Sequence, residues 1–192
     1  MTKKIPVDLL LFDGTMDGIV LATRKGFNAK ALKIPRSKLS EAAEEIKKCN
    51  VGVYFLFSEE TVIGVETLYI GESENLYKRL QQHGVNKLDW ITAIAFCSPD
   101  LNKTVIKYIE KKLFDAVKTN GHNATIQKAA ASIAISEADT LFADSFMDEI
   151  RLSLSVFGYV ALQKTEKSSD LYYCKSKDAD AAGFRSTNGF TV

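Results

Sequence analysis

The residues best suited to chemistry lie between positions 54 and 110. They are Tyr54, Tyr69, Arg79, His83 and Glu110. An arginine can neutralise charge on a phosphate, and a glutamate can hold Mg²⁺ or Mn²⁺ through its oxygens. A tyrosine or histidine can move the proton of an attacking water, although a tyrosine with its ordinary pKa of about 10 is a poor base unless a metal ion and an arginine favour the phenolate. Together these residue types suit metal-dependent hydrolysis of a phosphodiester.

Two short strand patterns must position the tyrosines. The stretches GVYFLF (52–57) and TLYIG (67–71) are rich in aromatic and β-branched residues, which is typical of strands. Because side chains alternate between faces, Tyr54 lies on the face opposite Val53 and Phe55. If the strands pair as a hairpin, both tyrosines fall on one face. For either tyrosine taken alone, an ordinary core residue with a satisfied hydroxyl is the alternative.

The helix expected after Gly71 carries two polar residues on its buried face. With about 100° per residue, Arg79 and His83 both project within about 60° of the inward-facing Leu76. Burying a guanidinium without a partner costs several kcal/mol, so this face should meet an anion or open into a cleft. The alternatives are an internal pair with a carboxylate, or an arginine whose stem packs while its head reaches water.

A second helix, expected from about 103 to 118, carries the glutamate. Its apolar stripe consists of Ile106, Ile109, Leu113 and Val117. Glu110 projects inside this stripe, about 40° from Ile106, so it needs a cation, which is either Arg79 or a metal ion. Lys103, Lys107 and Lys111 run along the flank beside it. They could hold a phosphate backbone, or they could form an ordinary solvated face.

The remaining segments predict further elements around this unit. Extended pieces within residues 6–35 indicate a small antiparallel β element, and Ser37 is a candidate N-cap for a helix that follows. Residues 91–98 read as a third strand, and a helix is expected from Ser136 to about Val156. The last stretch returns to β-like alternation, with Asn188-Gly189 as a hairpin turn.

These elements predict an α+β fold. We expect a small three-stranded antiparallel sheet flanked by helices, with an N-terminal β element and a C-terminal helix plus a partial β module. The corresponding segments are 1–49, 50–120, 121–160 and 161–192, the last resembling a module cut short.

Composition limits the classes of function. The formal net charge is only +1, so a nucleic-acid partner must be held by a local patch. No apolar run approaches the roughly 18 residues needed to span a bilayer, and the N-terminus does not resemble a signal peptide, so no membrane association is expected. Cys49, Cys97 and Cys174 are odd in number and show no pairing or metal-ligand spacing, which favours a reduced, cytoplasmic setting.

These residues, in this order, resemble the GIY-YIG nucleases. GVY at 52–54 and YIG at 69–71 match the paired motif of the family, and the resemblance covers about residues 50–118. It implies a three-stranded antiparallel sheet packed by helices and divalent-metal-dependent cleavage of DNA. The flanking segments are similar to bacterial proteins in which this module sits between poorly characterised regions, and the C-terminal piece resembles the start of a domain of unknown function.

The resemblance also implies roles for individual residues. Tyr54 and Tyr69 correspond to the paired tyrosines, of which one, commonly the first, acts as general base or orients the water. Arg79 would contact phosphate, His83 would assist proton transfer, and Glu110 would hold the metal. Asn123 is the nearest candidate for an asparagine that follows the glutamate helix in the family. Some members, such as the excinuclease C subunit, have a lysine where this chain has Glu72, an acid that would not help phosphate binding.

The sequence therefore favours an endonuclease that hydrolyses DNA with a single divalent ion, Mg²⁺ or Mn²⁺. A second hypothesis is a catalytically weak or inactive nucleic-acid-binding module that keeps the lysines and binds DNA without metal, in a salt-sensitive way. A third is an interaction scaffold in which Arg79 and Glu110 form an internal ion pair. In that case Glu110→Ala should destabilise the protein by a few kcal/mol, because a buried cation would lose its partner.

Overall fold

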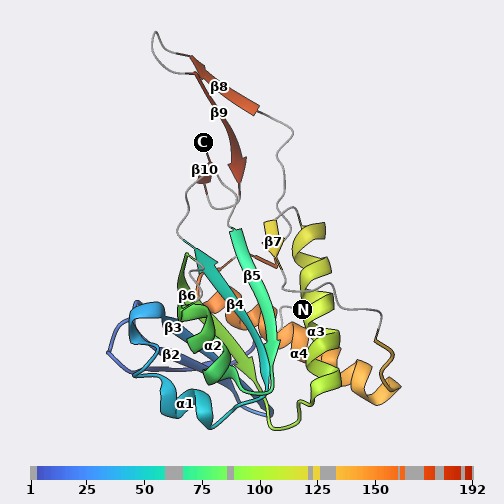
Figure 1. The fold of residues 1–192 in the computed structure, drawn as a ribbon. Coiled ribbons are helices and arrows are strands. Elements are labelled where there is room, and N and C mark those ends of the chain that lie inside the picture. Colours follow the sequence, from blue (N-terminus) through green and yellow to red (C-terminus); the bar gives the residue numbers. More distant parts are fainter. Residues whose placement is uncertain are drawn as a thin grey trace.

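A seven-stranded sheet with helices on both faces forms the centre of the molecule (Figure 1). The computed structural model describes residues 4–58, 67–85, 89–120, 123–125, 133–159, 161–162, 171–175, 180–186 and 189–191. The strands of the large sheet are β1 (Asp8–Leu11), β2 (Val20–Arg24), β3 (Phe27–Pro35), β4 (Gly52–Ser58), β5 (Thr67–Ser73), β6 (Trp90–Cys97) and β7 (Asn123–Thr125). The helices are α1 (Ala43–Lys47), α2 (Leu76–Val85), α3 (Lys103–Thr119) and α4 (Glu137–Val156), with a 3₁₀ turn at Arg36–Lys38. The class is therefore α+β.

The predicted three-stranded sheet is wrong in extent. The expected strands β6, β4 and β5 are adjacent, but they are the middle of a sheet with the order β1-β2-β3-β6-β4-β5-β7. The N-terminal strands join it because β3 pairs antiparallel with the free edge of β6, from Lys30↔Cys97 to Pro35↔Thr92. At the other edge β7 pairs in parallel with β5. Alternation in the sequence identifies each strand but not its neighbour, so it does not predict that β3 pairs with the edge of β6.

A second, smaller sheet holds the C-terminal strands. It consists of β8 (Leu171–Lys175), β9 (Asp180–Ser186) and β10 (Gly189–Thr191), in the order β10-β9-β8 with both pairs antiparallel. The expected hairpin is present as the β9–β10 pair, and Asn188 of its predicted turn lies outside the described residues.

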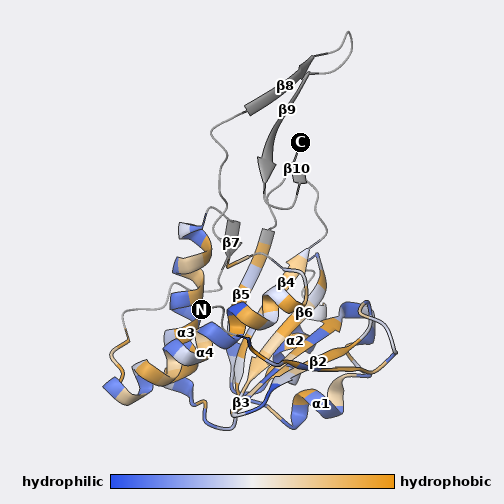
Figure 2. Cartoon of the chain, turned by 180° about the vertical axis from the view of Figure 1, so that it is seen from behind, coloured by the Kyte–Doolittle hydropathy of each residue, from blue (hydrophilic) through white to orange (hydrophobic). Residues whose placement is uncertain are grey.

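The large sheet separates two apolar clusters. On one face, which we call the α3/α4 face, Phe55 and Phe96 of the sheet pack with residues of α3 and α4. On the other, the α2 face, Tyr54 and Leu56 pack with residues of α1 and α2. The central strands β4 and β6 are correspondingly hydrophobic along most of their length (Figure 2). The predicted alternation of Tyr54 and Phe55 across β4 is confirmed.

The two long helices begin close to their predicted starts, near residue 103 and after Ser136. Asn102 accepts hydrogen bonds from the backbone N–H groups of Thr104 and Val105 at the start of α3. Ser136 accepts one from the backbone N–H of Asp139 at the start of α4. The helix expected directly after Ser37 is shorter than predicted, because residues 36–38 form a 3₁₀ turn without a side-chain cap and α1 begins only at Ala43.

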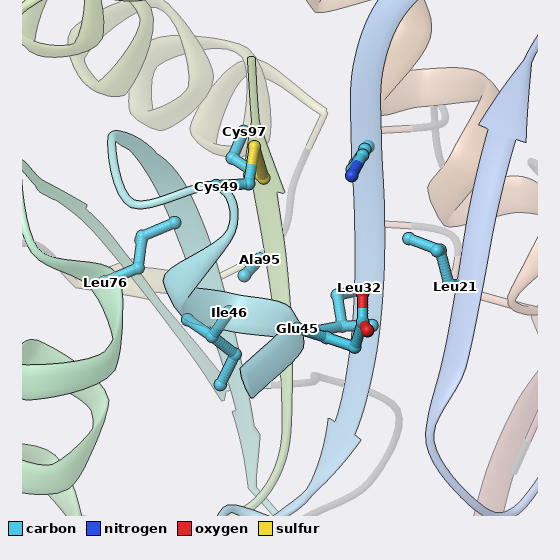
Figure 3. Close-up of a pocket in the computed structure, with 9 residues that line it drawn as sticks. Leu21, Leu32, Glu45, Ile46, Cys49, Leu76, Ala95 and Cys97 are labelled. Atoms are coloured by element: carbon cyan, nitrogen blue, oxygen red, sulfur yellow. A yellow bond between two sulfur atoms is a disulfide. The ribbon is translucent and has the colours of Figure 1, made fainter. Parts of the chain in front are cut away.

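Two cysteines are paired, contrary to the prediction from their spacing. Cys49 and Cys97 form a disulfide with their Cα atoms 5.7 Å apart. They are 48 residues apart in the chain, but the pairing of β4 with β6 aligns Gly52 with Cys97 and so brings the segment before β4 to the end of β6. The bond lies beside a small pocket that is also lined by Ile46, Leu76 and Ala95 (Figure 3). None of the helices in the described ranges combines the length and apolarity that crossing a bilayer requires.

Candidate functional site

Two glycines allow the strands that carry the tyrosines to pack closely. A side chain at Gly71 would overlap the hydroxyl and ring of Tyr54, which lies opposite it in the β4–β5 pair. A side chain at Gly52 would overlap the backbone carbonyl oxygen of Phe96 in β6. Gly71 therefore leaves room for the Tyr54 hydroxyl to cross β5, and Gly52 lets β4 approach β6.

The Tyr54 hydroxyl is the meeting point of three other side chains. It lies 2.7 Å from Nε2 of His83 and accepts a hydrogen bond of 3.2 Å from Nε of Arg79. The rings of Tyr54 and Tyr69 stack with centroids 6.1 Å apart, and the two hydroxyls interact. Because the arginine nitrogen can only donate, the single Tyr54 proton is left for either His83 or Tyr69. The two tyrosines thus share one face with Arg79 and His83, as predicted.

Helix α2 holds Arg79 and His83 in this position through contacts at both of its ends. At its start, the Asn75 side chain accepts the backbone N–H of Lys78, and the carbonyl of Asn50 accepts that of Leu76. At its end, the Arg36 guanidinium donates to the carbonyl oxygens of Gly84 and Trp90. The face that packs on the sheet includes Leu76, Leu80 and His83. Helical periodicity puts His83 on the same face as Leu76 and Leu80, and the contacts at both ends hold this helix in place.

Burial sets the charge state of the two innermost groups. It raises the pKa of Tyr54 far above its ordinary value, with the neighbouring Tyr69 adding to the effect and Arg79 opposing it. The pKa of His83 falls to about 4, first because the ring is buried and second because Arg79 is near. At neutral pH the histidine is therefore uncharged and Tyr54 keeps its proton. Tyr54 is fully buried, whereas Tyr69 is partly exposed.

Glu110 lies at the outer edge of β5. Strand β7 pairs only with Thr67–Tyr69, and beyond that point the Glu110 carboxylate accepts the backbone N–H of Glu72. Its side chain is buried, as the apolar stripe of α3 predicts. Burial and the nearby Glu72 raise the pKa of Glu110 to about 7, against weaker opposing effects of Lys103 and Arg79. Within the described part of the chain Glu110 forms no ion pair with Arg79.

The three flanking lysines do not form one open stripe. The Lys103 ammonium contacts both oxygens of Glu72, at 2.8 and 3.0 Å, and approaches Glu74 at 3.7 Å. Lys111 lies 3.8 Å from Asp115 on its own helix, and Lys107 is exposed. The sequence suggested a shared role for the three lysines, but tertiary contacts distinguish Lys103 from the other two. Asn123 lies in β7 next to Thr67, and its side chain is outside the described residues.

Glu72 is the residue whose place in the site sequence reasoning missed. The sequence marks it only as a departure from the lysine of some GIY-YIG nucleases, yet its side chain is mostly buried and both its oxygens accept hydrogen bonds from Lys103. The signal was available in the strand pattern, because Leu68, Ile70 and Glu72 are two residues apart and so lie on the same face of β5, the α3/α4 face. An acid on that face needs a partner from the helix packed against it.

The donor set near Glu110 fits a hard divalent cation with few protein ligands. Across the described residues, no three His, Cys, Asp or Glu side chains gather as a metal-binding group. Mg²⁺, however, keeps several waters and commonly uses one or two carboxylates. Glu110 is a buried carboxylate close to a second acid, which is the situation that a bound cation relieves.

Comparison with known proteins assigns no family to the chain. No protein-family model matches the chain, and no curated protein or solved structure shows significant similarity to it.

Proposed function

We propose that this protein is a metal-dependent endonuclease that hydrolyses phosphodiester bonds of DNA. The observation that carries the proposal is the contact of Arg79 with two tyrosine hydroxyls beside a neutral histidine, with the buried Glu110 within electrostatic reach of Arg79. This combination offers a cation for the phosphate, phenols for a water and a carboxylate for Mg²⁺ or Mn²⁺. The resemblance of the GVY and YIG segments to GIY-YIG nucleases supports the same reading.

The chemistry divides between Arg79 and the tyrosines. The Arg79 guanidinium stabilises the negative charge that grows on the phosphate oxygens, and a divalent ion held by Glu110 would add Lewis-acid stabilisation there when bound. A water oxygen forms the new bond to phosphorus, the bond from phosphorus to one ester oxygen breaks, and a proton ends on the leaving oxygen.

Tyr69 is the better placed of the two phenols to meet that water. Tyr54 is fully buried and its pKa is raised, so it does not form a phenolate readily. Tyr69 is partly exposed, and Arg79 contacts its hydroxyl, where the guanidinium stabilises negative charge. In this assignment the Tyr69 hydroxyl orients the water, and the proton that the water loses is balanced by the proton that the leaving oxygen gains. Tyr54 and His83 hold Tyr69 and Arg79 in place, so they act as positioning residues.

The decisive experiment is cleavage of supercoiled plasmid and of branched and single-stranded DNA with Mg²⁺, Mn²⁺ or EDTA. We expect metal-dependent cleavage by the wild type and a loss of about 10²- to 10³-fold in Glu110→Gln and in Arg79→Gln. Glu137→Gln, an exposed acid at the start of α4, is the matched control and should cleave normally. Equal cleavage by the wild type and Glu110→Gln would refute the assignment of the site.

Binding measurements separate the second candidate function from the first. A nucleic-acid-binding module without catalysis would show salt-sensitive binding of labelled DNA that EDTA leaves unchanged, and no cleavage under any of the conditions. The scaffold hypothesis is less favoured, because the ion pair of Glu110 with Arg79 that it requires is not among the contacts of the described residues.

A further inference from the structure

We propose that Glu72 is a second carboxylate ligand of the divalent ion held by Glu110. When no ion is bound, the Lys103 ammonium occupies the position of the ion. This inference rests on the proposed function, because it concerns the same ion. It assigns a role to the one acid in the site that differs from the family pattern described above.

The contacts place the three residues around one point at the edge of β5. Glu110 accepts the backbone N–H of Glu72, so the two acids meet where β5 runs past the end of β7. The Glu72 side chain is 15% exposed, and the Lys103 ammonium lies within hydrogen-bond distance of both its oxygens. Two carboxylates this close repel each other, and Lys103 hydrogen-bonds to Glu72 but acts on Glu110 only through a weaker electrostatic attraction.

Lys103 has the properties expected of a replaceable cation. Its side chain is 41% exposed, on a flexible four-carbon stem at the first turn of α3. An ammonium is a compact point charge that a divalent ion can replace at the same carboxylate. The exposed Glu74, 3.7 Å away, offers the displaced lysine a nearby partner, and so would a phosphate oxygen of bound DNA.

The test measures Mn²⁺ binding to the full chain by isothermal titration calorimetry, without DNA. We expect Glu72→Gln to weaken Mn²⁺ binding by about tenfold or more, since a ligand is lost. Lys103→Met should tighten it several-fold, because a competing positive charge is removed. Lys118→Met, near the other end of α3 and exposed, is the matched control and should leave the affinity unchanged.

Thermal unfolding supplies a second readout that does not depend on nuclease activity. Lys103→Met leaves Glu72 without its cation, so we expect a lower Tm in EDTA and a larger rise on adding Mn²⁺ than in the wild type. This variant also keeps the inference testable if Glu72→Gln does not fold.

The outcomes distinguish this inference from the proposed function. If Glu110→Gln abolishes Mn²⁺ binding and Glu72→Gln leaves it intact, Glu110 alone holds the ion and the role of Glu72 is refuted. Weaker binding in Lys103→Met would show that the lysine supports the ion instead of competing with it. If neither the wild type nor any variant binds Mn²⁺, the proposed function itself fails.

Discussion

The two faces of strand β4 present side chains of different polarity. Toward α3 and α4 the strand presents Val53, Phe55 and Phe57, all buried in an apolar cluster. Toward α2 it presents Tyr54 and Leu56, and the tyrosine hydroxyl lies among Arg79, His83 and Tyr69. One strand therefore contributes dispersion and hydrophobic burial on one side and a hydrogen-bonded polar cluster on the other.

The interiors of the two faces are therefore stabilised in different ways, while the proposed metal ligands Glu72 and Glu110 lie at the outer edge of the α3/α4 face. On the α3/α4 face, the removal of apolar area from water stabilises the folded state. The α2 face buries a neutral histidine and a phenol, which cost free energy unless their polar atoms are satisfied, and a disulfide stands at its end. A face that only had to be stable would not need these groups. The comparison therefore predicts that substitutions on the two sides lower the free energy of unfolding by different amounts.

The largest effect should come from truncating the apolar side. Phe55→Ala removes a fully buried ring and should lower the free energy of unfolding by about 3–5 kcal/mol. Tyr54→Phe, on the adjacent position and the opposite face, keeps the ring and loses only the hydroxyl, so it should cost about 1–2 kcal/mol. Urea denaturation of both variants measures the contrast. Equal losses would mean that the two faces are not distinguished in this way.

The disulfide should account for the next effect. Linking residues 48 positions apart removes loop-closure entropy from the unfolded chain, and the chain-entropy model gives about 4 kcal/mol. Reduction with dithiothreitol should lower the Tm, and Cys49→Ser with Cys97→Ser should show the same Tm with or without reductant. We also expect faster amide exchange at the start of α2, since Asn50 next to Cys49 accepts the backbone N–H of Leu76. An unchanged Tm would show that the bond adds no stability.

The smallest effect concerns the pH dependence of stability, because two buried groups oppose each other. His83 has a folded pKa of about 4 against 6.5, so its contribution is present above pH 6.5 and is lost as the pH falls toward 4. Glu110 has a folded pKa of about 7 against 4.5, so the protein gains stability from it as the pH falls from 7 toward 4.5. Glu110→Gln removes the stability gained from Glu110 at lower pH and keeps the stability lost through His83.

Unfolding in EDTA at pH 7.5 and pH 5 tests this opposition. Between these values Glu110→Gln should lose about 2 kcal/mol more stability than the wild type does. His83→Gln should change in the opposite direction and become relatively more stable at pH 5. Parallel curves for all three proteins would show that neither group is buried in the charge state described above.

Much of the site could be predicted from the sequence because it depends on local periodicity. Alternation in β4 placed Tyr54 opposite Phe55, and helical spacing turned His83 and Glu110 inward, where both are buried. The capping residues Asn102 and Ser136 mark the starts of α3 and α4 by the same kind of short-range rule. These features follow from backbone geometry over a few residues.

The sequence by itself thus determined the approximate positions of β4, β5, β6, α2, α3 and α4 and which way their side chains point, but neither the observed extent of α1 nor strand β7. Only the tertiary structure decided which elements contact each other. It pairs β3 with the edge of β6, joins Cys49 to Cys97 in a disulfide and places Lys103 in an ion pair with Glu72. Strand order, disulfide pairing and ion pairing join residues far apart in the chain, and local pattern carries no information about such distances. The charge of Glu110 belongs to the second group, because burial and the approach of Glu72 set it.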